Sequence, residues 1–372
     1  MWVTAAFGGA TKFGEAVLAI RYRELNEKGE QSGGPMYYIK NGMKEKFGGN
    51  WAWLGWLFSF FGIFASFGIG SMVQSNSVAD ALNMSFGIPM IISGVAITLL
   101  VGLVIIGGIK SIASVTSKIV PFMALFFIAG SLIVLFSRIN MIPKAFNMIF
   151  SHAFSSTAVS GGLIGTVIRL GVARGVFSNE AGLGSAPIAH AASSNDNAYT
   201  QGLIASLGSF IDTLIICTMT ALVILVSGLI SFAPDGLMIV ADGLNGASLT
   251  TRAFDINLPG FGKYLISIGL VFFAFSTILG WYYYGSKCLE YIAGTGSVSF
   301  YKWIFLAVTL LGSIMKIGIV WDLSDTFNGL MALPNLIALL ALSSIIMKTA
   351  SEGEKTSTTS NSIKNRTAAK MG

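Results

Sequence analysis

Long apolar stretches separated by short polar segments dominate the pattern of this chain. Nine of them approach the roughly 20 residues that an α-helix needs to cross a bilayer. The pattern therefore predicts an all-α membrane protein with about nine spans, which form one transmembrane domain over residues 1–348. The stretches are Met1–Ile20, Trp53–Val73, Ile88–Gly108, Ile119–Ser137, Ser160–His190, Gly202–Ile230, Gly262–Tyr284, Phe300–Val320 and Phe327–Met347.

The segments between and after these stretches have their own character. Asn140–Thr157 is short and amphipathic, which favours a helix lying in the membrane interface. Ser231–Pro259 is polar, and we expect it outside the cell with a short helix of its own. Residues 349–372 are rich in Ser, Thr, Lys and Asn, which predicts a disordered tail. Overall only 11% of the 372 residues are charged, far below the roughly 25% of soluble domains.

The distribution of Lys and Arg indicates the topology. Cytoplasmic loops of membrane proteins carry an excess of these residues. One set of alternate loops, together with the tail, carries Arg21, Arg23, Lys28, Lys40, Lys44, Lys46, Lys110, Lys118, Lys287, Lys302, Lys348, Lys355, Lys364, Arg366 and Lys370. The opposite set carries only Arg138, Lys144, Arg252, Lys263 and Lys316. We therefore expect a multi-pass protein of the cell membrane with a cytoplasmic C-terminus, and no nucleic-acid partner.

A polar, glycine-rich run, Phe177–Pro187, interrupts the stretch Ser160–His190. Non-helical backbone at membrane depth is tolerated only where it is buried in protein or lines a wet cavity. Gly182 and Gly184 allow the backbone to leave helical geometry, and Pro187 suits the start of a second half-helix. The bare helix end offers N–H groups to a carboxylate, and Asn179 supplies a donor and an acceptor. A tight packing turn is the alternative.

Six ionisable side chains lie within the apolar stretches, where each costs about 2.5–3.5 kcal/mol at the bilayer centre. They should face the bundle interior and pair with one another. In the structural interpretation these side chains only form ion pairs, for example Arg174 with Glu180 or Asp212. The alternative is that they handle protons or substrate directly. The set is Lys12, Glu15, Arg169, Arg174, Glu180 and Asp212.

Two further polar clusters interrupt apolar stretches. Ser276 and Thr277, with a carbonyl one turn earlier, offer hard oxygen ligands that suit Na⁺. Hydroxyls bonded back to helix carbonyls are the ordinary alternative. Trp281, one turn further on, could wall a pocket or serve only packing. The run that begins at Gln74 either caps a span or lines the entrance to a site.

An internal repeat is a further possibility. The stretch Met1–Ile20 contains Lys12 and Glu15, and Gly202–Ile230 contains a lone acid, Asp212. If the two halves form an inverted repeat, these two spans correspond to each other. A partner of the broken segment should then precede residue 1.

The chain resembles the family of alanine or glycine:cation symporters. The resemblance rests on motifs that follow one another in family order over nearly the whole chain. They are GGPMYYI (Gly33–Ile39), QSNSVA (Gln74–Ala79), GGIKSIA (Gly107–Ala113), GVFSNEAGLGSAPIAH (Gly175–His190), FAFSTILGWYYYG (Phe273–Gly285) and the segment Asp325–Leu339.

The resemblance implies a LeuT-type fold of inverted repeats and sodium-driven uptake of alanine or glycine by alternating access. Na⁺ would be the coupling ion, and no other cofactor is implied. Carried over by position, the substrate-binding residues would be Phe177, Ser178, Asn179, Gly182, Gly184, Ser185, Trp281 and Gln74. Ser276 and Thr277 would bind sodium.

The front of the chain departs from the family pattern, because family members begin with a further broken helix that has a glycine-rich signature. We therefore expect an N-terminally truncated transporter, and a non-transporting fragment is the alternative function. An intramembrane serine hydrolase is the rival class. Ser185 and His190 lie five positions apart on one expected helix and point to different faces, so we expect no enzyme.

Overall fold

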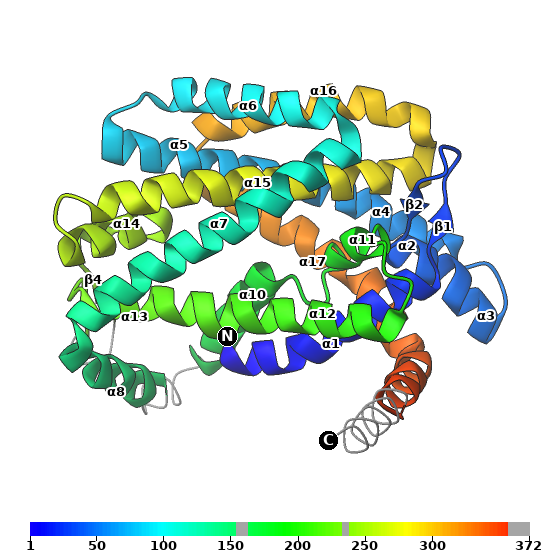
Figure 1. The fold of residues 1–372 in the computed structure, drawn as a ribbon, viewed down its shortest axis with the longest axis horizontal. Helices are drawn as coiled ribbons and strands as arrows, with labels where there is room; N and C mark the ends of the chain where they lie inside the picture. Colours follow the sequence, from blue (N-terminus) through cyan, green and yellow to red (C-terminus); the bar gives the residue numbers. More distant parts are fainter. Residues whose placement is uncertain (154–162, 233–237, 356–372) are drawn as a thin grey trace, which may run out of the picture.

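A computed structural model gives the structure of residues 1–153, 163–232 and 238–355. Most of these residues form helices that pack into a bundle (Figure 1). Two small antiparallel hairpins, which the apolar pattern did not predict, project from it. One pairs β1 (Glu24–Leu25) with β2 (Gln31–Ser32), with Glu24 opposite Ser32. The other pairs β3 (Ile230–Phe232) with β4 (Met238–Val240).

Six helical segments within the described residues are long and apolar enough to cross a membrane. The chain is therefore a mostly helical, multi-pass membrane protein. Three of the segments lie in single helices: α7 (Gly108–Ser137), α15 (Gly262–Ala293) and Val320–Ala341 within α17 (Ile317–Ala341). Ala52–Phe86 consists of α4 (Ala52–Ala65), η2 (Ser66–Met72) and α5 (Val73–Phe86), and Ala198–Val226 consists of α12 (Ala198–Ser209), η4 (Phe210–Cys217) and α13 (Thr218–Val226). Thr295–Ile314 consists of η6 (Thr295–Ser297) and α16 (Val298–Ile314).

The three remaining stretches of the nine expected spans do not meet that length and hydropathy. α1 (Trp2–Arg21) contains Lys12 and Glu15, and α6 (Met90–Ile106) has only 17 residues. The interrupted stretch forms α10 (Leu163–Asn179) and α11 (Ala186–Ala191). The predicted number of nine spans is therefore not confirmed.

The boundary between the last two spans differs from the prediction. We expected a span to end at Val320 and the next to begin at Phe327. The backbone is instead extended at Met315 and Lys316, between α16 and α17. Apolar residues flank this turn on both sides, so hydropathy alone does not locate it.

The polar segments form short helices. They are α2 (Pro35–Tyr38), η1 (Ile39–Met43), α3 (Lys44–Phe47), η3 (Ile139–Met141), α8 (Ile142–Ala153), η5 (Ala241–Gly243) and α14 (Gly246–Asn257). α8 and α14 match the helices expected in Asn140–Thr157 and Ser231–Pro259. Residues 343–355 are also helical. The helix includes 349–355, the first part of the tail predicted to be disordered, while 356–372 lie outside the described residues and their disorder stays a prediction.

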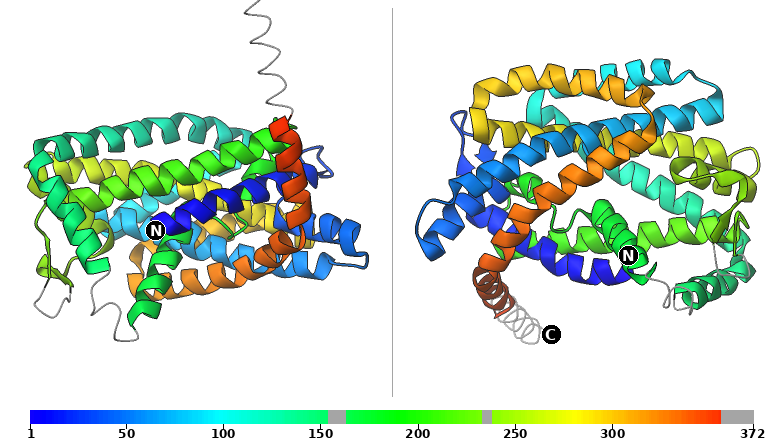
Figure 2. Two further views of the ribbon diagram at one scale, coloured as in Figure 1. Left: turned by 90° about the horizontal axis from the view of Figure 1, so that it is seen from below. Right: turned by 180° about the vertical axis from the view of Figure 1, so that it is seen from behind.

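Helices of the first half of the chain pack against helices of the second half. α1 lies along α12, α4 and α5 lie against α15, and α6 lies against α16. Figures 1 and 2 show α1 beside α12 and α6 beside α16 from several sides. The contact between α1 and α12 joins the two spans that the repeat hypothesis pairs.

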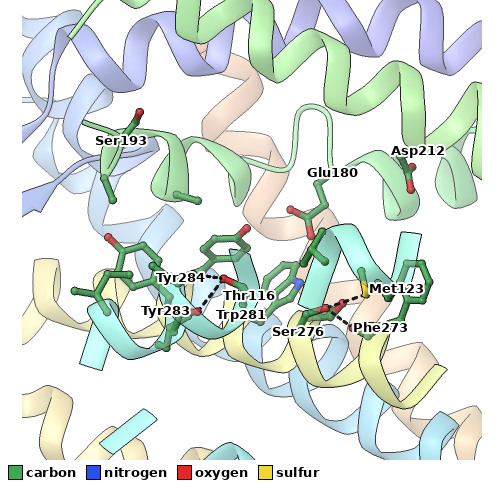
Figure 3. A pocket seen from close by; sticks show the side chains of 18 residues that line it. Thr116, Met123, Glu180, Ser193, Asp212, Phe273, Ser276, Trp281, Tyr283 and Tyr284 are labelled. Carbon is green, nitrogen blue, oxygen red and sulfur yellow. Dashed lines mark hydrogen bonds between the residues drawn. The ribbon is translucent and has the colours of Figure 1, made fainter. Parts of the chain in front are cut away.

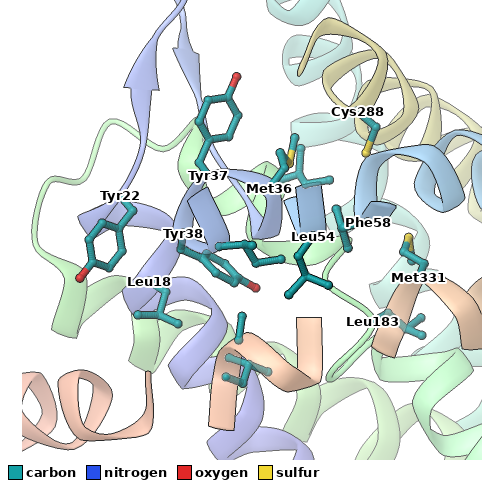
Figure 4. Packing of buried hydrophobic residues seen from close by; sticks show 14 of the residues in the cluster. Leu18, Tyr22, Met36, Tyr37, Tyr38, Leu54, Phe58, Leu183, Cys288 and Met331 are labelled. Carbon is teal, nitrogen blue, oxygen red and sulfur yellow. The ribbon is translucent and has the colours of Figure 1, made fainter. Parts of the chain in front are cut away.

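An apolar cluster packs around the break in the α10–α11 segment (Figure 4). Leu18 of α1, Tyr38 of α2 and Phe58 of α4 are fully buried there. Leu183 of the break and Met331 of α17 complete the contact. Helices within a bilayer associate through van der Waals packing of this kind, so the core of the bundle holds the irregular backbone in place.

Candidate functional site

The break that the sequence predicts lies between Asn179, where α10 ends, and Ala186, where α11 begins. Three of its residues adopt left-handed backbone angles: Glu180 with φ 57°, Gly182 with φ 83° and Gly184 with φ 86°. Glycine adopts such angles readily, whereas a residue with a side chain is strained there. The conformation of Glu180 therefore needs support from its surroundings.

The two glycines of the break face the protein core. A Cβ atom on Gly184 would lie 2.6 Å from Phe58 and 2.7 Å from Pro35. A Cβ atom on Gly182 would lie 3.1 Å from Leu336. Neither glycine lines the cavity described below. They serve the fold of the break: Gly184 has no room for a Cβ atom, whereas at Gly182 the contact is tight and the positive φ favours glycine.

A buried polar network ties the break to α1 and α17. The Glu15 carboxylate is fully buried, and its Oε1 accepts hydrogen bonds from Gly184 N at 3.1 Å and Asn335 Nδ2 at 2.7 Å. Asn335 Nδ2 also donates to Gly182 O at 2.9 Å, and Asn335 Oδ1 accepts from the Tyr38 hydroxyl. Free backbone groups of the break are thus satisfied by side chains from helices far away in the sequence.

A cavity of about 610 Å³ lies beside the break (Figure 3). Glu180 and Asp212 line one side of it, from the break and from η4. Ser276, Thr277 and Trp281 of α15 line the opposite side. The structure therefore brings the predicted sodium-binding pair, the predicted pocket wall and two carboxylates to one space.

Hydroxyl groups hold both carboxylates of this cavity. Ser185 Oγ donates to Glu180 Oε2 at 2.8 Å. Ser178 Oγ and Thr213 Oγ1 donate to Asp212 Oδ2, at 2.6 and 3.1 Å. Ser178 and Ser185, both predicted to bind substrate, thus orient acidic side chains and do not themselves line the cavity.

Asn179, also predicted to bind substrate, has a structural role in the break. Its side chain is 3% exposed. Its Oδ1 accepts a hydrogen bond from Ala181 N at 3.0 Å, and its Nδ2 donates to Thr213 Oγ1 at 3.2 Å. These bonds cap the end of α10 and fasten it to η4, so both ends of the amide are engaged within the protein.

The predicted sodium ligands line the cavity wall on α15. Ser276 Oγ donates to Phe273 O at 2.9 Å, which leaves its lone pairs free to bind a cation. Phe273 and Thr277 also line the cavity. The donor set of hydroxyl oxygens, together with the carboxylates opposite, has the chemistry that hard cations require.

Two residues predicted to bind substrate lie elsewhere. The Phe177 ring packs against Trp321 at 5.0 Å between centroids and lines a different cavity. Gln74 Nε2 donates to Ile69 O at 3.1 Å, within the helix that carries it. Neither side chain lines the cavity beside the break.

The predicted pairing of Arg174 with Glu180 or Asp212 is wrong. Arg174 forms its ion pair with Asp325 of α17. The partners are 151 positions apart in the sequence, so helical spacing could not predict the pair. No local pattern predicted the role of Asn335, although it lies in the family-like segment Asp325–Leu339.

Comparison with known proteins gives a family match. The model of the sodium:alanine symporter family matches residues 1–367. The chain is 50% identical to the sodium/alanine symporter AgcS of Methanococcus maripaludis, over 93% of this chain and 75% of that protein. It is 38% identical to the putative sodium/proton-dependent alanine carrier YrbD of Bacillus subtilis, over 92% of this chain and 71% of that protein. It is 35% identical to the probable sodium/glutamine symporter GlnT of Bacillus subtilis, over 93% of this chain and 69% of that protein.

These matches bear on the expected truncation. The family model matches the chain from its first residue almost to its last. The comparison therefore gives no support to the expectation that a family helix is missing, and it does not favour the fragment hypothesis. The matched proteins are transporters, which agrees at the family level with the prediction that the chain is not an enzyme.

Proposed function

Because this chain belongs to the sodium:alanine symporter family, we propose that it couples Na⁺ entry to the uptake of alanine and glycine. The observation that carries the proposal is the cavity beside the break. It gathers Ser276, Thr277 and Trp281 opposite Glu180 and Asp212 in the middle of a helical membrane bundle. Pockets with a few convergent polar groups are the usual places for small ligands.

In this proposal Na⁺ binds to the hydroxyl oxygens of Ser276 and Thr277. The nearby negative charge of Asp212 and Glu180 favours a cation in the same cavity. Inward movement of one charge through 100 mV releases about 2.3 kcal/mol. That free energy drives the amino acid against its own gradient when both ligands must bind before the transporter changes state.

The amino acid binds between the broken helix and α15. Its ammonium group pairs with the carboxylates that Ser178 and Ser185 orient, and Trp281 limits the space for its side chain. Asn179, Gly182 and Gly184 contribute by fixing the path of the backbone. A wall of this kind separates alanine from larger residues better than from glycine, since one methyl group changes binding only by about 1–3 kcal/mol.

We further propose alternating access in a LeuT-type inverted repeat. The contacts of α1 with α12, of α4 and α5 with α15, and of α6 with α16 support a relation between the two halves. The cavity reaches Ser193, in the loop after the fifth expected span, which by alternation of the spans lies on the same side as the C-terminus. We therefore assign this conformation to the inward-facing state of a plasma-membrane protein with a cytoplasmic C-terminus.

Uptake of labelled alanine into proteoliposomes tests the proposal. We expect uptake with an inward Na⁺ gradient, none with K⁺ in its place, and competition by unlabelled glycine. Ser276→Ala and Thr277→Val should raise the sodium concentration needed for half-maximal uptake. Ser117→Ala is the matched control, because Ser117 also bonds back to a helix carbonyl but is exposed. Sodium-independent uptake, or no uptake at all, contradicts the proposal.

A further inference from the structure

A second cavity, of about 540 Å³, is lined by other residues of the broken segment than the first. Glu180 lines the first cavity, whereas Phe177 and Leu183 line the second. Arg174 of α10 and Asp325 of α17 also line it. We propose that this cavity is a second binding site for a small neutral amino acid in its zwitterionic form. The identity of the ligand rests on the proposed function.

Arg174 supplies the group that would bind the carboxylate of the amino acid. Its guanidinium carbon lies 4.8 Å from the ring centroid of Trp321 and 5.5 Å from that of Phe177. The two rings hold the guanidinium in place by cation–π contacts. Among the described residues only its Nη2 forms a hydrogen bond, to Asp325. The remaining N–H donors are free to bind a carboxylate through paired hydrogen bonds.

The ion pair between Arg174 and Asp325 does not block this role. The two side chains are 38% and 46% exposed. Exposed ion pairs contribute little to stability, because water screens them and long side chains lose freedom when they pair. The carboxylate of a free amino acid can therefore join or replace Asp325 on the guanidinium.

Asn328 and Asp325 supply acceptors for the ammonium group. They lie three positions apart on α17 and so occupy one face of the helix. Asn328 is 7% exposed, and its Oδ1 has no hydrogen-bond partner within the described part of the chain. A buried acceptor without a partner is unfavourable until a donor reaches it. The oxygen itself is enclosed in the observed conformation, so the side chain has to turn into the cavity, where an ammonium group provides that donor.

The rest of the cavity selects a neutral side chain. Apart from Arg174, Asp325 and Asn328, all of its lining residues are apolar, and they are Val172, Ala173, Val176, Phe177, Leu183, Gly329 and Ala332. A charged side chain would lose its hydration there without gaining a partner. The arrangement therefore fits one cationic and one anionic group on a small apolar body.

Protection of engineered cysteines tests the assignment. Gly329 lines the second cavity, and an added Cβ there meets no atom within 4 Å. Gly280 lines the first cavity, and the nearest atom to an added Cβ is 3.9 Å away. Gly329→Cys and Gly280→Cys are therefore matched reporters. Each is made with Cys217→Ala and Cys288→Ala, purified, and labelled with a thiol reagent at increasing alanine concentrations.

We expect alanine to slow the labelling of both reporters. Asn328→Leu removes one hydrogen bond to a charged group, which should raise the alanine concentration for half-protection of Gly329→Cys by roughly tenfold or more. Arg174→Gln should have an effect in the same direction. Neither change should alter the protection of Gly280→Cys, and this unchanged protection also demonstrates that the variants fold.

Trp281→Ala separates direct from indirect protection. If the second cavity binds alanine itself, protection of Gly329→Cys persists when the first cavity is impaired. Protection confined to Gly280→Cys, or protection of Gly329→Cys that survives Asn328→Leu and Arg174→Gln, overturns the second site and leaves the proposed function standing. Protection of neither reporter contradicts both.

Discussion

Individual residues of the break are fixed by backbone geometry and close packing. Gly184 combines a left-handed φ with contacts that leave no room for a Cβ atom. Glu180 adopts a left-handed φ although it has a side chain, and its carboxylate accepts a hydrogen bond from Ser185. Strain of this kind persists where the surroundings enforce it, and it concentrates at functional sites.

Gly184→Ala should destabilise the protein. The new methyl group would overlap Phe58 and Pro35 and impose a strained backbone, with a loss of about 1–3 kcal/mol from the strain alone. The apparent free energy of unfolding in mixed micelles measures the effect. Gly208→Ala is the matched control, since Gly208 lies in α12 with open space around it. Equal effects of the two substitutions contradict the account.

Glu15 is the acceptor on which the break depends, so its variants should differ in a defined order. Glu15→Ala leaves the N–H of Gly184 and the amide of Asn335 without their acceptor, and each unpaired group costs about 1–3 kcal/mol. Glu15→Gln keeps an oxygen at that place and should lose much less. Unfolding in mixed micelles and alanine uptake are measured for both. Identical losses would mean that the hydrogen bonds to Oε1 are unimportant.

At the scale of elements, polar side chains fasten the loop segments to the bundle. Arg23, which follows α1, donates to Ala191 O at 2.9 Å and Ser193 O at 2.7 Å, and so caps the end of α11. Glu24 of β1 accepts from Lys40 Nζ at 3.0 Å and Asn41 Nδ2 at 2.6 Å. These contacts tie the β1–β2 hairpin to the half-helix on one side and to η1 on the other.

The attachment of this hairpin should weaken in acid. Partial burial raises the pKa of Glu24, but the hydrogen bonds from Lys40 and Asn41 outweigh it and leave the pKa below its ordinary value of 4.5. Because the pKa is lower in the folded state than in the unfolded state, the stabilisation is complete at pH values above the pKa of the unfolded state. It is lost as the pH falls through the pKa of the folded state. Hydrogen exchange of residues 24–32, corrected for intrinsic rates, should therefore accelerate below about pH 4.

Glu24→Gln is the control for that experiment. The amide cannot titrate in this range, so the corrected exchange rate of the hairpin should not change there. A wild-type hairpin whose protection is constant through the same pH range contradicts the role of the Glu24 carboxylate.

Local sequence predicted some elements well and others poorly, for physical reasons. The break was predictable because glycine, proline and polar residues in an apolar stretch act on the backbone where they stand. The turn at Met315 and Lys316 was not, since apolar residues flank it on both sides. The partners of Glu15 and Arg174 were missed because Asn335 and Asp325 reach them only through the packing of α17 on the bundle.

Some residues of the candidate site were likewise predicted from the sequence, and others were not. Thr277 and Trp281 lie four positions apart on α15, so their common face followed from helical spacing, and Ser276 is the direct neighbour of Thr277. Phe177 and Gln74 were placed at the same site by resemblance, yet they lie away from that cavity. Which face of a helix meets a cavity depends on its rotation in the bundle, which the sequence of that helix does not specify.

At the scale of the whole molecule, the proposed coupling requires that the cavity beside the break holds both ligands. The broken segment lines this cavity together with α7, η4 and α15, and other residues of the same segment line the second cavity. Two ligands in one cavity favour each other's binding when both stabilise the same state. Such coupling is typically about 5- to 150-fold in affinity, and it is reciprocal.

The most direct test of this central claim is the dissociation constant of labelled alanine for the purified protein, measured with saturating Na⁺ and without Na⁺. We predict that Na⁺ tightens alanine binding by at least about fivefold, and that Thr277→Val together with Ser276→Ala removes this effect. An alanine affinity that is the same with and without Na⁺ would contradict it.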